Sequence, residues 1–151
     1  MRGILLVFLA SSAIGAENLL TNSGFEFGYG PAGNADAWTY RSSERLVVER
    51  TADQPHGGNH ALRLAVGADH EVTWYQVGQE MAAPRSRLPL TLSGWVRTRE
   101  VRDGVGAYLS LNFFDAGGKR TGYFDSRTVV GTQDYQRLTV SGAPPPGSSR
   151  L

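Results

Sequence analysis

The sequence predicts an all-β protein, an antiparallel β-sandwich or jelly roll, and three observations lead to that prediction. Short segments in which apolar and polar residues alternate recur from Trp38 to Val140, as expected for strands with one buried face. Turn-forming residues separate them, with 19 glycines and 7 prolines among 151 residues. No stretch has the apolar periodicity of a convincing amphipathic helix. Several short strands separated by turns indicate an antiparallel sandwich, and the length fits one domain.

Two segments show the strand pattern most clearly. Residues 90–98 place Leu92 and Val96 on one face and Trp95 and Arg97 on the other, and residues 107–114 alternate in the same way. The turn at 115–119 joins the second segment to 121–124 in a predicted hairpin. Further strands are expected at 38–40, 46–48, 62–66, 72–77 and 135–140, with turns at 67–70 and 131–134.

Residues 1–16 have the three parts of a secretion signal. Met1 and Arg2 supply one positive charge, residues 3–10 form an apolar run, and residues 11–16 are mostly small. The run is shorter than the roughly 20 residues that a membrane-spanning helix needs. We expect cleavage after Gly15 or Ala16, leaving 17–151 as one secreted, extracellular or periplasmic domain. The alternative is an uncleaved anchor or a buried first strand.

Composition excludes several classes of function. The chain has no cysteine, which rules out disulfides, thiolate metal sites and a cysteine nucleophile. Its formal net charge is +1, so nothing favours a nucleic acid or a membrane as partner. No nucleophile elbow, phosphate-binding loop or nicotinamide fingerprint is present, and we expect no enzymatic activity. His56 and His60 are four residues apart, but the two glycines between them indicate a loop rather than a helical metal site.

The segment 18–26, Asn-Leu-Leu-Thr-Asn-Ser-Gly-Phe-Glu, carries a resemblance. Followed by Trp38, it resembles the opening of the carbohydrate-binding modules grouped as families 4, 9, 16 and 22, which are galactose-binding-like jelly rolls. Segments 56–64, 77–81, 92–97 and 131–140 are similar to later parts of these modules and follow in the same order. The resemblance covers essentially all of residues 17–151.

The resemblance implies a non-catalytic module that binds a polysaccharide or oligosaccharide. Such a module holds a larger glycoside hydrolase or lyase on its substrate. Two other functions remain open at this point. One is a cell-surface or interaction domain of the same fold without a sugar site, and the other is a small catalytic β-sandwich such as a lyase.

The end of the chain departs from the family pattern. The modules usually finish with a strand that follows a Pro-Gly turn and ends in an aromatic residue and two aspartates. Here the turn at 144–147 is followed by four residues. We expect either a fragment of a longer protein with further domains, which we favour, or a partner chain that supplies the missing strand.

The resemblance also implies a structural Ca²⁺ ion. In the family, calcium is held by a carboxylate of the opening motif, by main-chain carbonyls and by an aspartate of the closing strand. Glu26 matches the carboxylate, and Asn22 and Asn59 mark the carbonyl segments. Without the closing aspartate the predicted site is incomplete. The alternative is that Glu26 is a surface carboxylate or pairs with an arginine.

Candidate sugar-binding residues follow from the chemistry of sugars, which present flat C–H faces between hydroxyl groups. A binding surface therefore needs exposed aromatic rings with polar partners. The polar faces of 90–98 and 107–114, the latter including Tyr108, have this mixture and are expected to form one groove. The ligand-binding candidates are Trp74, Gln76, Trp95, Arg97, Asn112, Phe114, Tyr135 and Arg137. The alternatives are that these rings serve the core, or that sugars bind at a loop edge near Tyr29, Trp38 and Tyr40.

Overall fold

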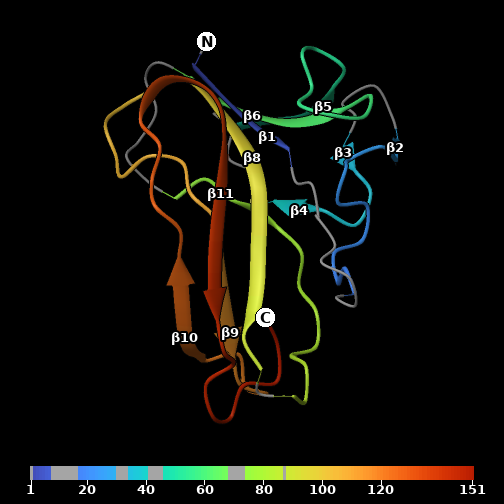
Figure 1. Ribbon diagram of the computed structural model, residues 1–151, viewed down its shortest axis with the longest axis vertical. Helices are drawn as coiled ribbons and strands as arrows, with labels where there is room; N and C mark the ends of the chain where they lie inside the picture. The colour runs from blue at the N-terminus through green and yellow to red at the C-terminus, as the bar shows by residue number, and fades with distance from the viewer. Residues whose placement is uncertain (1, 8–16, 30–33, 41–45, 68–73, 87) are drawn as a thin grey trace.

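The computed structural model describes residues 2–7, 17–29, 34–40, 46–67, 74–86 and 88–151 (Figure 1). These ranges contain no helix, and all of their strand pairs are antiparallel, as in a β-sandwich. The strands are β1 (Arg2–Val7), β2 (Gly28–Tyr29), β3 (Asn34–Ala35), β4 (Thr39–Tyr40), β5 (Leu46–Thr51), β6 (Ala61–Val66), β7 (Val77–Gly78), β8 (Leu90–Val101), β9 (Ser110–Phe114), β10 (Arg120–Asp125) and β11 (Gly131–Gly142).

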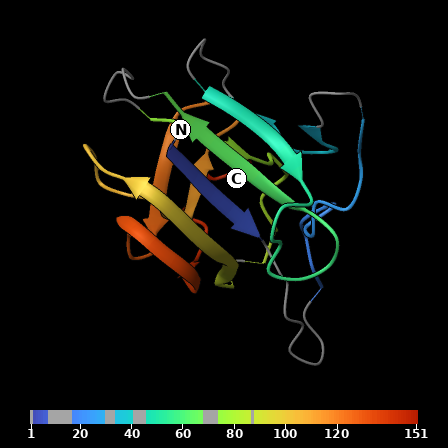
Figure 2. The same cartoon turned by 90° about the horizontal axis from the view of Figure 1, so that it is seen from above.

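The larger sheet has the strand order β11-β8-β1-β6-β5. Its two long members, β8 and β11, curve side by side along the molecule (Figure 1). Figure 2 shows β1 lying between β6 and β8, and it pairs with both. Within this sheet, β8, β1 and β6 have hydrogen-bonded neighbours on both sides, and β11 and β5 are the edge strands.

The second layer is built on the β9–β10 hairpin. Residues 149–151 extend it, because Phe114 N donates to Arg150 O at 2.9 Å and Leu151 N donates to Met81 O at 3.0 Å. Met81 N in turn donates to Leu151 O at 2.9 Å. The last residues of the chain thus lie between β9 and the segment 81–83, and β2–β3 and β4–β7 form two further short pairs.

One apolar core lies between the two layers. Its fully buried members include Phe25, Leu62, Val96 and Phe113. Strand alternation accounts for this: every second residue is buried in β9 and in the central part of β8, from Gly94 to Thr98, and the residues between them are partly exposed. Burying such side chains stabilises the fold by about 1.5–3 kcal/mol each.

Most predicted strands are confirmed, with bounds that differ by a few residues. The predicted turn at 131–134 is wrong, because these residues begin β11. The strand continues through them because its pairing with β8 shifts register twice between Gly131 and Gln136. Of the predicted strand at 72–77 only Val77 is in a strand, and residues 72–73 lie outside the described ranges.

The N-terminal segment takes a strand conformation where it is described. Residues 2–7 are β1, whereas residues 8–16, with the expected cleavage point, lie outside the described residues. In the part of the chain that the structure describes, no helix is long and apolar enough to cross a membrane. Cleavage of the predicted signal stays a prediction.

Substitution of Gly142 tests how the two layers pack against each other. A Cβ at this buried position of β11 would overlap the ring of Phe124 on β10. We expect Gly142→Ala to lower the free energy of unfolding by about 1–3 kcal/mol through overpacking, measured by urea denaturation. Gly104→Ala is the matched control, because a Cβ there meets no atom of the described residues within 4 Å. Equal effects of the two substitutions would contradict this packing.

Candidate functional site

The β9–β10 hairpin has a well-defined turn and register. Asp115 closes the turn, because Lys119 N donates to its Oδ1 at 2.9 Å and Gly118 N to its main-chain oxygen at 3.1 Å. Gly118 has φ of +83°, a conformation that glycine adopts without strain. The resulting register places Tyr123 opposite Asn112. Side chains from both strands are thereby fixed on one outward face.

We name this surface the β9–β10 outer face. It is the side of the hairpin that points away from Leu111 and Phe113, which are buried in the core. Cross-strand partners share a face, so the pairing of the two strands sets its membership. The side chains that make contacts on this face are those of Tyr108, Ser110, Asn112, Arg120, Tyr123 and Asp125, with Trp74 beside it.

Arg120, Tyr123 and Asn112 form an ordered group on this face. The guanidinium carbon of Arg120 lies 4.7 Å from the centre of the Tyr123 ring, a cation–π arrangement. Arg120 Nη1 also donates to Asn112 Oδ1 at 3.5 Å, and Asn112 Nδ2 donates to Ser110 Oγ at 2.8 Å. The Tyr123 side chain nevertheless stays 55% exposed. The group therefore presents an open ring beside amide, hydroxyl and guanidinium groups.

Trp74 and Tyr108 supply two more rings. Their ring centres lie 6.1 Å apart with an angle of 82° between planes, an edge-to-face contact. Trp74 is 66% exposed, whereas Tyr108 is half-buried. Burial, and then the nearby Asp125 carboxylate, raise the pKa of Tyr108 above its usual 10.0 although Arg120 opposes them. The Tyr108 hydroxyl therefore stays neutral at physiological pH and can donate or accept a hydrogen bond.

Four of the predicted binding residues lie on the outward side of the larger sheet instead. Trp95 and Arg97 are on β8, and Tyr135 and Arg137 are on β11. The two sheets do not pair with each other there, because β8 pairs with β11 and β1, and β9 pairs with β10. The single groove expected from strands 90–98 and 107–114 is therefore not formed by the described residues.

The loop 52–60 packs over this second surface. The His56 ring stacks on Trp95 with centres 4.0 Å apart and makes an edge contact with Tyr135 at 5.0 Å. Tyr135 Oη donates to the main-chain oxygen of Gln54 at 2.9 Å, and Arg97 donates to the Gln54 side chain. Burial raises the pKa of Tyr135 to about 12. These rings are engaged in holding the loop.

Through its contact with Tyr108, Trp74 thus lies beside the face that carries Asn112, whereas Trp95, Arg97, Tyr135 and Arg137 lie on the other sheet. Phe114 ends β9 and alternates to the same side as Asn112, whereas Gln76 is exposed on the segment before β7. Sequence reasoning did not select Tyr123 and Arg120 as binding residues. The sequence does contain evidence for Tyr123, because alternation along the predicted hairpin places it on the same side as Asn112.

Trp38 does not belong to an exposed loop-edge site. It is buried, its ring centre lies 5.0 Å from that of Phe25, and its Nε1 donates to Asn22 O at 3.0 Å. Tyr40 packs partly against the same core. The side chain of Tyr29 lies outside the described part of the structure. Trp38 is therefore not available to bind a sugar at the loop edge.

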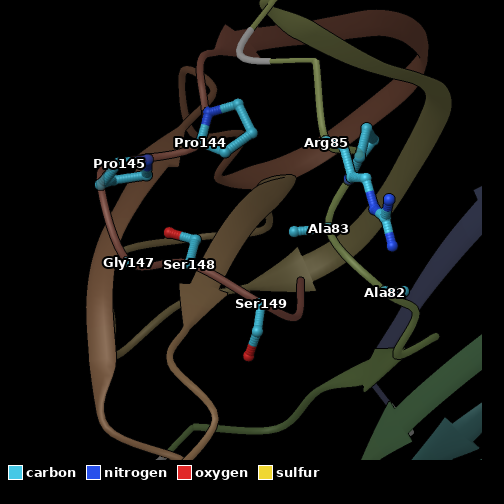
Figure 3. Close-up of a pocket in the computed structure, with 9 residues that line it drawn as sticks. Ala82, Ala83, Arg85, Pro144, Pro145, Gly147, Ser148 and Ser149 are labelled. Atoms are coloured by element: carbon cyan, nitrogen blue, oxygen red, sulfur yellow. The ribbon is translucent and has the colours of Figure 1, made fainter.

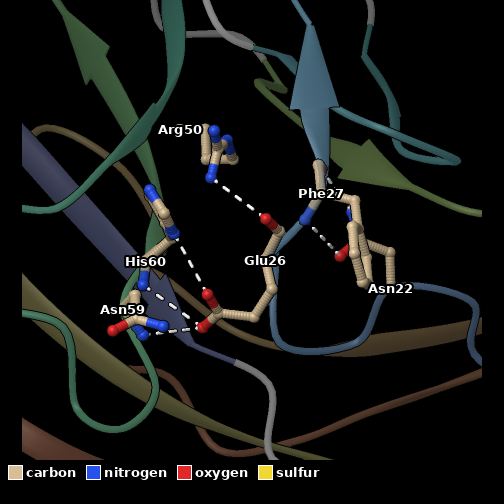
Figure 4. A network of polar contacts seen from close by, with 6 residues as sticks. All are labelled: Asn22, Glu26, Phe27, Arg50, Asn59 and His60. Atoms are coloured by element: carbon tan, nitrogen blue, oxygen red, sulfur yellow. Dashed lines mark hydrogen bonds and ion pairs between the residues drawn. The ribbon is translucent and has the colours of Figure 1, made fainter.

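Glu26 joins the opening segment to the loop before β6 (Figure 4). Its Oε1 accepts hydrogen bonds from Asn59 N at 2.8 Å and His60 N at 3.3 Å, and its Oε2 lies 3.0 Å from His60 Nδ1. Gly58 has φ of +67°, and a Cβ there would overlap the Glu26 carboxylate. Arg50 Nη1 donates to the main-chain oxygen of Glu26 at 3.2 Å. We call this arrangement the Glu26 latch.

In the latch, nitrogen atoms already engage the carboxylate that calcium would use. Both carboxylate oxygens of Glu26 face nitrogen atoms, and the contact of Asn59 with Glu26 is made by its main-chain N–H. Asn22 is also engaged: its side chain bonds Phe27 O at 2.7 Å, and its main-chain oxygen accepts from Phe25 and Trp38. Among the described residues, no three His, Cys, Asp or Glu side chains group around a possible metal. Calcium binding stays a prediction, and this arrangement does not fit it.

A hollow of about 450 Å³ lies at another part of the surface, between segments 82–85 and 144–149 (Figure 3). Arg85 and the hydroxyls of Ser148 and Ser149 supply its polar groups, and Pro144 and Pro145 supply apolar surface. The described residues that line it include no aromatic ring and no carboxylate. The hollow therefore lacks the stacking surface that the β9–β10 outer face has.

Comparison with protein-family models, with curated proteins and with solved structures finds no match for this chain. The candidate site is therefore defined by geometry and chemistry alone.

The Glu26 latch predicts a pH-dependent stability. The His60 side chain, against an opposing effect of burial, and the amide N–H groups of residues 59 and 60 lower the pKa of Glu26 below its ordinary 4.5. A lowered folded-state pKa gives stabilisation that is present above 4.5 and is lost as pH falls through the folded value. We expect Glu26→Gln to cost about 1–3 kcal/mol at pH 7 and progressively less below pH 4.5.

Urea denaturation of both proteins across this pH range measures the difference. Glu80→Gln is the matched control, since Glu80 pairs with Arg150 through a side chain that is 62% exposed. A Glu26→Gln effect that is as small as the control, or that grows as pH falls, would contradict the latch.

Proposed function

We propose that residues 17–151 form a secreted, non-catalytic carbohydrate-binding domain with a galactose-binding-like jelly-roll fold, carried by a larger polysaccharide-degrading protein. The β9–β10 outer face is the observation that supports this proposal most strongly. It combines three aromatic rings with amide, hydroxyl, guanidinium and carboxylate groups within one small surface. This is the mixture that sugar recognition requires.

The rings supply the apolar part of recognition. Trp74 and Tyr123 are 66% and 55% exposed, so their faces are accessible to the C–H groups of a pyranose ring. Stacking on a ring that is already exposed and held in place needs little reorganisation. Trp74 is positioned by its contact with Tyr108, and Tyr123 by Arg120. Each such contact contributes about 0.5–1.5 kcal/mol beyond the area it buries.

The polar groups supply hydrogen bonds that orient a bound sugar. Asn112 and Ser110 lie on β9, and Arg120 and Asp125 lie on β10, so acceptors and donors flank the rings from two strands. Sugar hydroxyls both donate and accept hydrogen bonds, and therefore match such a mixed set. The surface is open rather than enclosed, which suits one face of a polysaccharide chain. We expect micromolar-type affinity, increased when several modules act together.

Affinity electrophoresis in gels that contain β-glucan, xylan, mannan or alginate tests the proposal. We expect retention on one glycan, and we expect Trp74→Ala and Tyr123→Ala each to weaken binding about tenfold. Tyr135→Phe is the matched control, because it removes a hydroxyl only from the surface beneath loop 52–60 and leaves retention unchanged. Unchanged retention in both alanine variants, with folding intact, would contradict this assignment of the site.

The second candidate function is an interaction domain without sugar binding. The same exposed rings favour it, because aromatic residues are also enriched in protein–protein contacts. The glycan panel separates the two functions. Retention on none of the glycans supports the interaction domain, and release of sugar fragments from a glycan would instead indicate catalysis.

A further inference from the structure

The strand position between β6 and β8 is occupied by a segment that secretion would remove. β1 pairs with β6 from Arg2↔Val66 to Leu6↔Leu62, and with β8 from Gly3↔Arg99 to Val7↔Trp95. Without it the larger sheet becomes two separate pairs, β11–β8 and β6–β5 (Figure 2). Each pair would then expose an unpaired row of N–H and C=O groups toward the other.

Neighbouring side chains specify what this position accepts on its inward side. Leu62 and Val96 flank one inward place, and Leu64 and Thr98 flank the next. All four are at most 3% exposed. Among the residues that the structure describes, the buried Thr98 hydroxyl oxygen has no hydrogen-bond partner. The inward places therefore favour one apolar residue and one residue that can bond this hydroxyl.

The outward side carries positive charge. Arg63 and Arg97 flank one outward place, and Arg99 flanks the next. Arg63 has a carboxylate partner in Glu49 at 2.6 Å, and Arg97 bonds the neutral Gln54 side chain. Acidic residues at these two outward places would complement the arginines.

The occupying sequence lacks these groups. Residues 2–7 read Arg-Gly-Ile-Leu-Leu-Val, with one positive charge, no acid and no side-chain amide or hydroxyl. This strand completes the backbone ladder but provides no partner for Thr98 and no anion for the arginines. Its composition fits a secretion signal better than it fits the position.

We propose that the position between β6 and β8 is a strand-acceptor site, and that its occupant after removal of residues 1–16 is an extended segment of a second polypeptide. That segment pairs antiparallel with both strands. It alternates acidic residues on the outward side with apolar or hydroxyl residues on the inward side. Strand addition of this kind takes affinity from main-chain hydrogen bonds and specificity from alternate side chains. The proposal uses the removal of the signal, and does not depend on sugar binding.

A pair of labelled hexapeptides tests the site. The first, Val-Asp-Thr-Glu-Val-Val, places acids at the outward positions of Gly3 and Leu5 and threonine at the position beside Thr98. The control peptide, Val-Lys-Thr-Lys-Val-Val, differs only in charge. We expect the acidic peptide to bind the chain lacking residues 1–16 about three- to tenfold more tightly by fluorescence anisotropy. Arg97→Glu should remove or reverse this preference.

The full-length chain provides a second test that does not require the shortened chain to fold. Gly3→Asp with Leu5→Glu should melt at a higher temperature than Gly3→Lys with Leu5→Lys, because only the charge facing the arginines differs. Intact mass confirms that residues 1–16 are present in both.

Equal melting temperatures of the two variants would overturn the proposal. A folded shortened chain that binds neither peptide, or that binds both equally, would also overturn it. Dimerisation of that chain with no peptide binding would make a second copy the occupant, and would also overturn it.

Discussion

The apolar core between the two layers is the constraint on which the rest of the structure depends. Val96 of β8 and Phe113 of β9 are both fully buried in it. Because side chains alternate along a strand, the neighbouring Trp95 and Asn112 are directed away from the core on different sheets. The core therefore divides the aromatic residues into two surfaces and prevents them from lining a single groove.

The two surfaces use their rings differently. Beneath loop 52–60, His56 stacks on Trp95 and makes an edge contact with Tyr135, so the loop covers part of both rings. On the β9–β10 outer face, Tyr123 stays exposed while Arg120 fixes it in place. A ligand gains most from a ring that is exposed and already ordered, because binding then costs little conformational entropy. This difference is why the proposed sugar site lies on the hairpin.

Alternation and turn chemistry were sufficient to predict most strands and the β9–β10 hairpin. They did not show which strands are neighbours, since 90–98 and 107–114 are consecutive in sequence yet belong to different sheets. Glu26 was predicted as a calcium ligand, and the structure shows its carboxylate bonded to Asn59 and His60 instead. Its partners could not be read from the sequence, because they are backbone N–H groups whose direction depends on the positive φ of Gly58. Bulged pairing in β11 was likewise hidden within a segment that reads as a turn.

Chemical-shift mapping with an oligosaccharide of the retained glycan tests the central claim most directly. Amide signals of residues 108–112 and 120–125, and the indole signal of Trp74, should shift in a saturable manner. Signals of residues 54–58 and of the Trp95 indole should stay in place, because those groups lie on the other surface. Shifts confined to Trp95, Tyr135 and loop 52–60 would contradict the account.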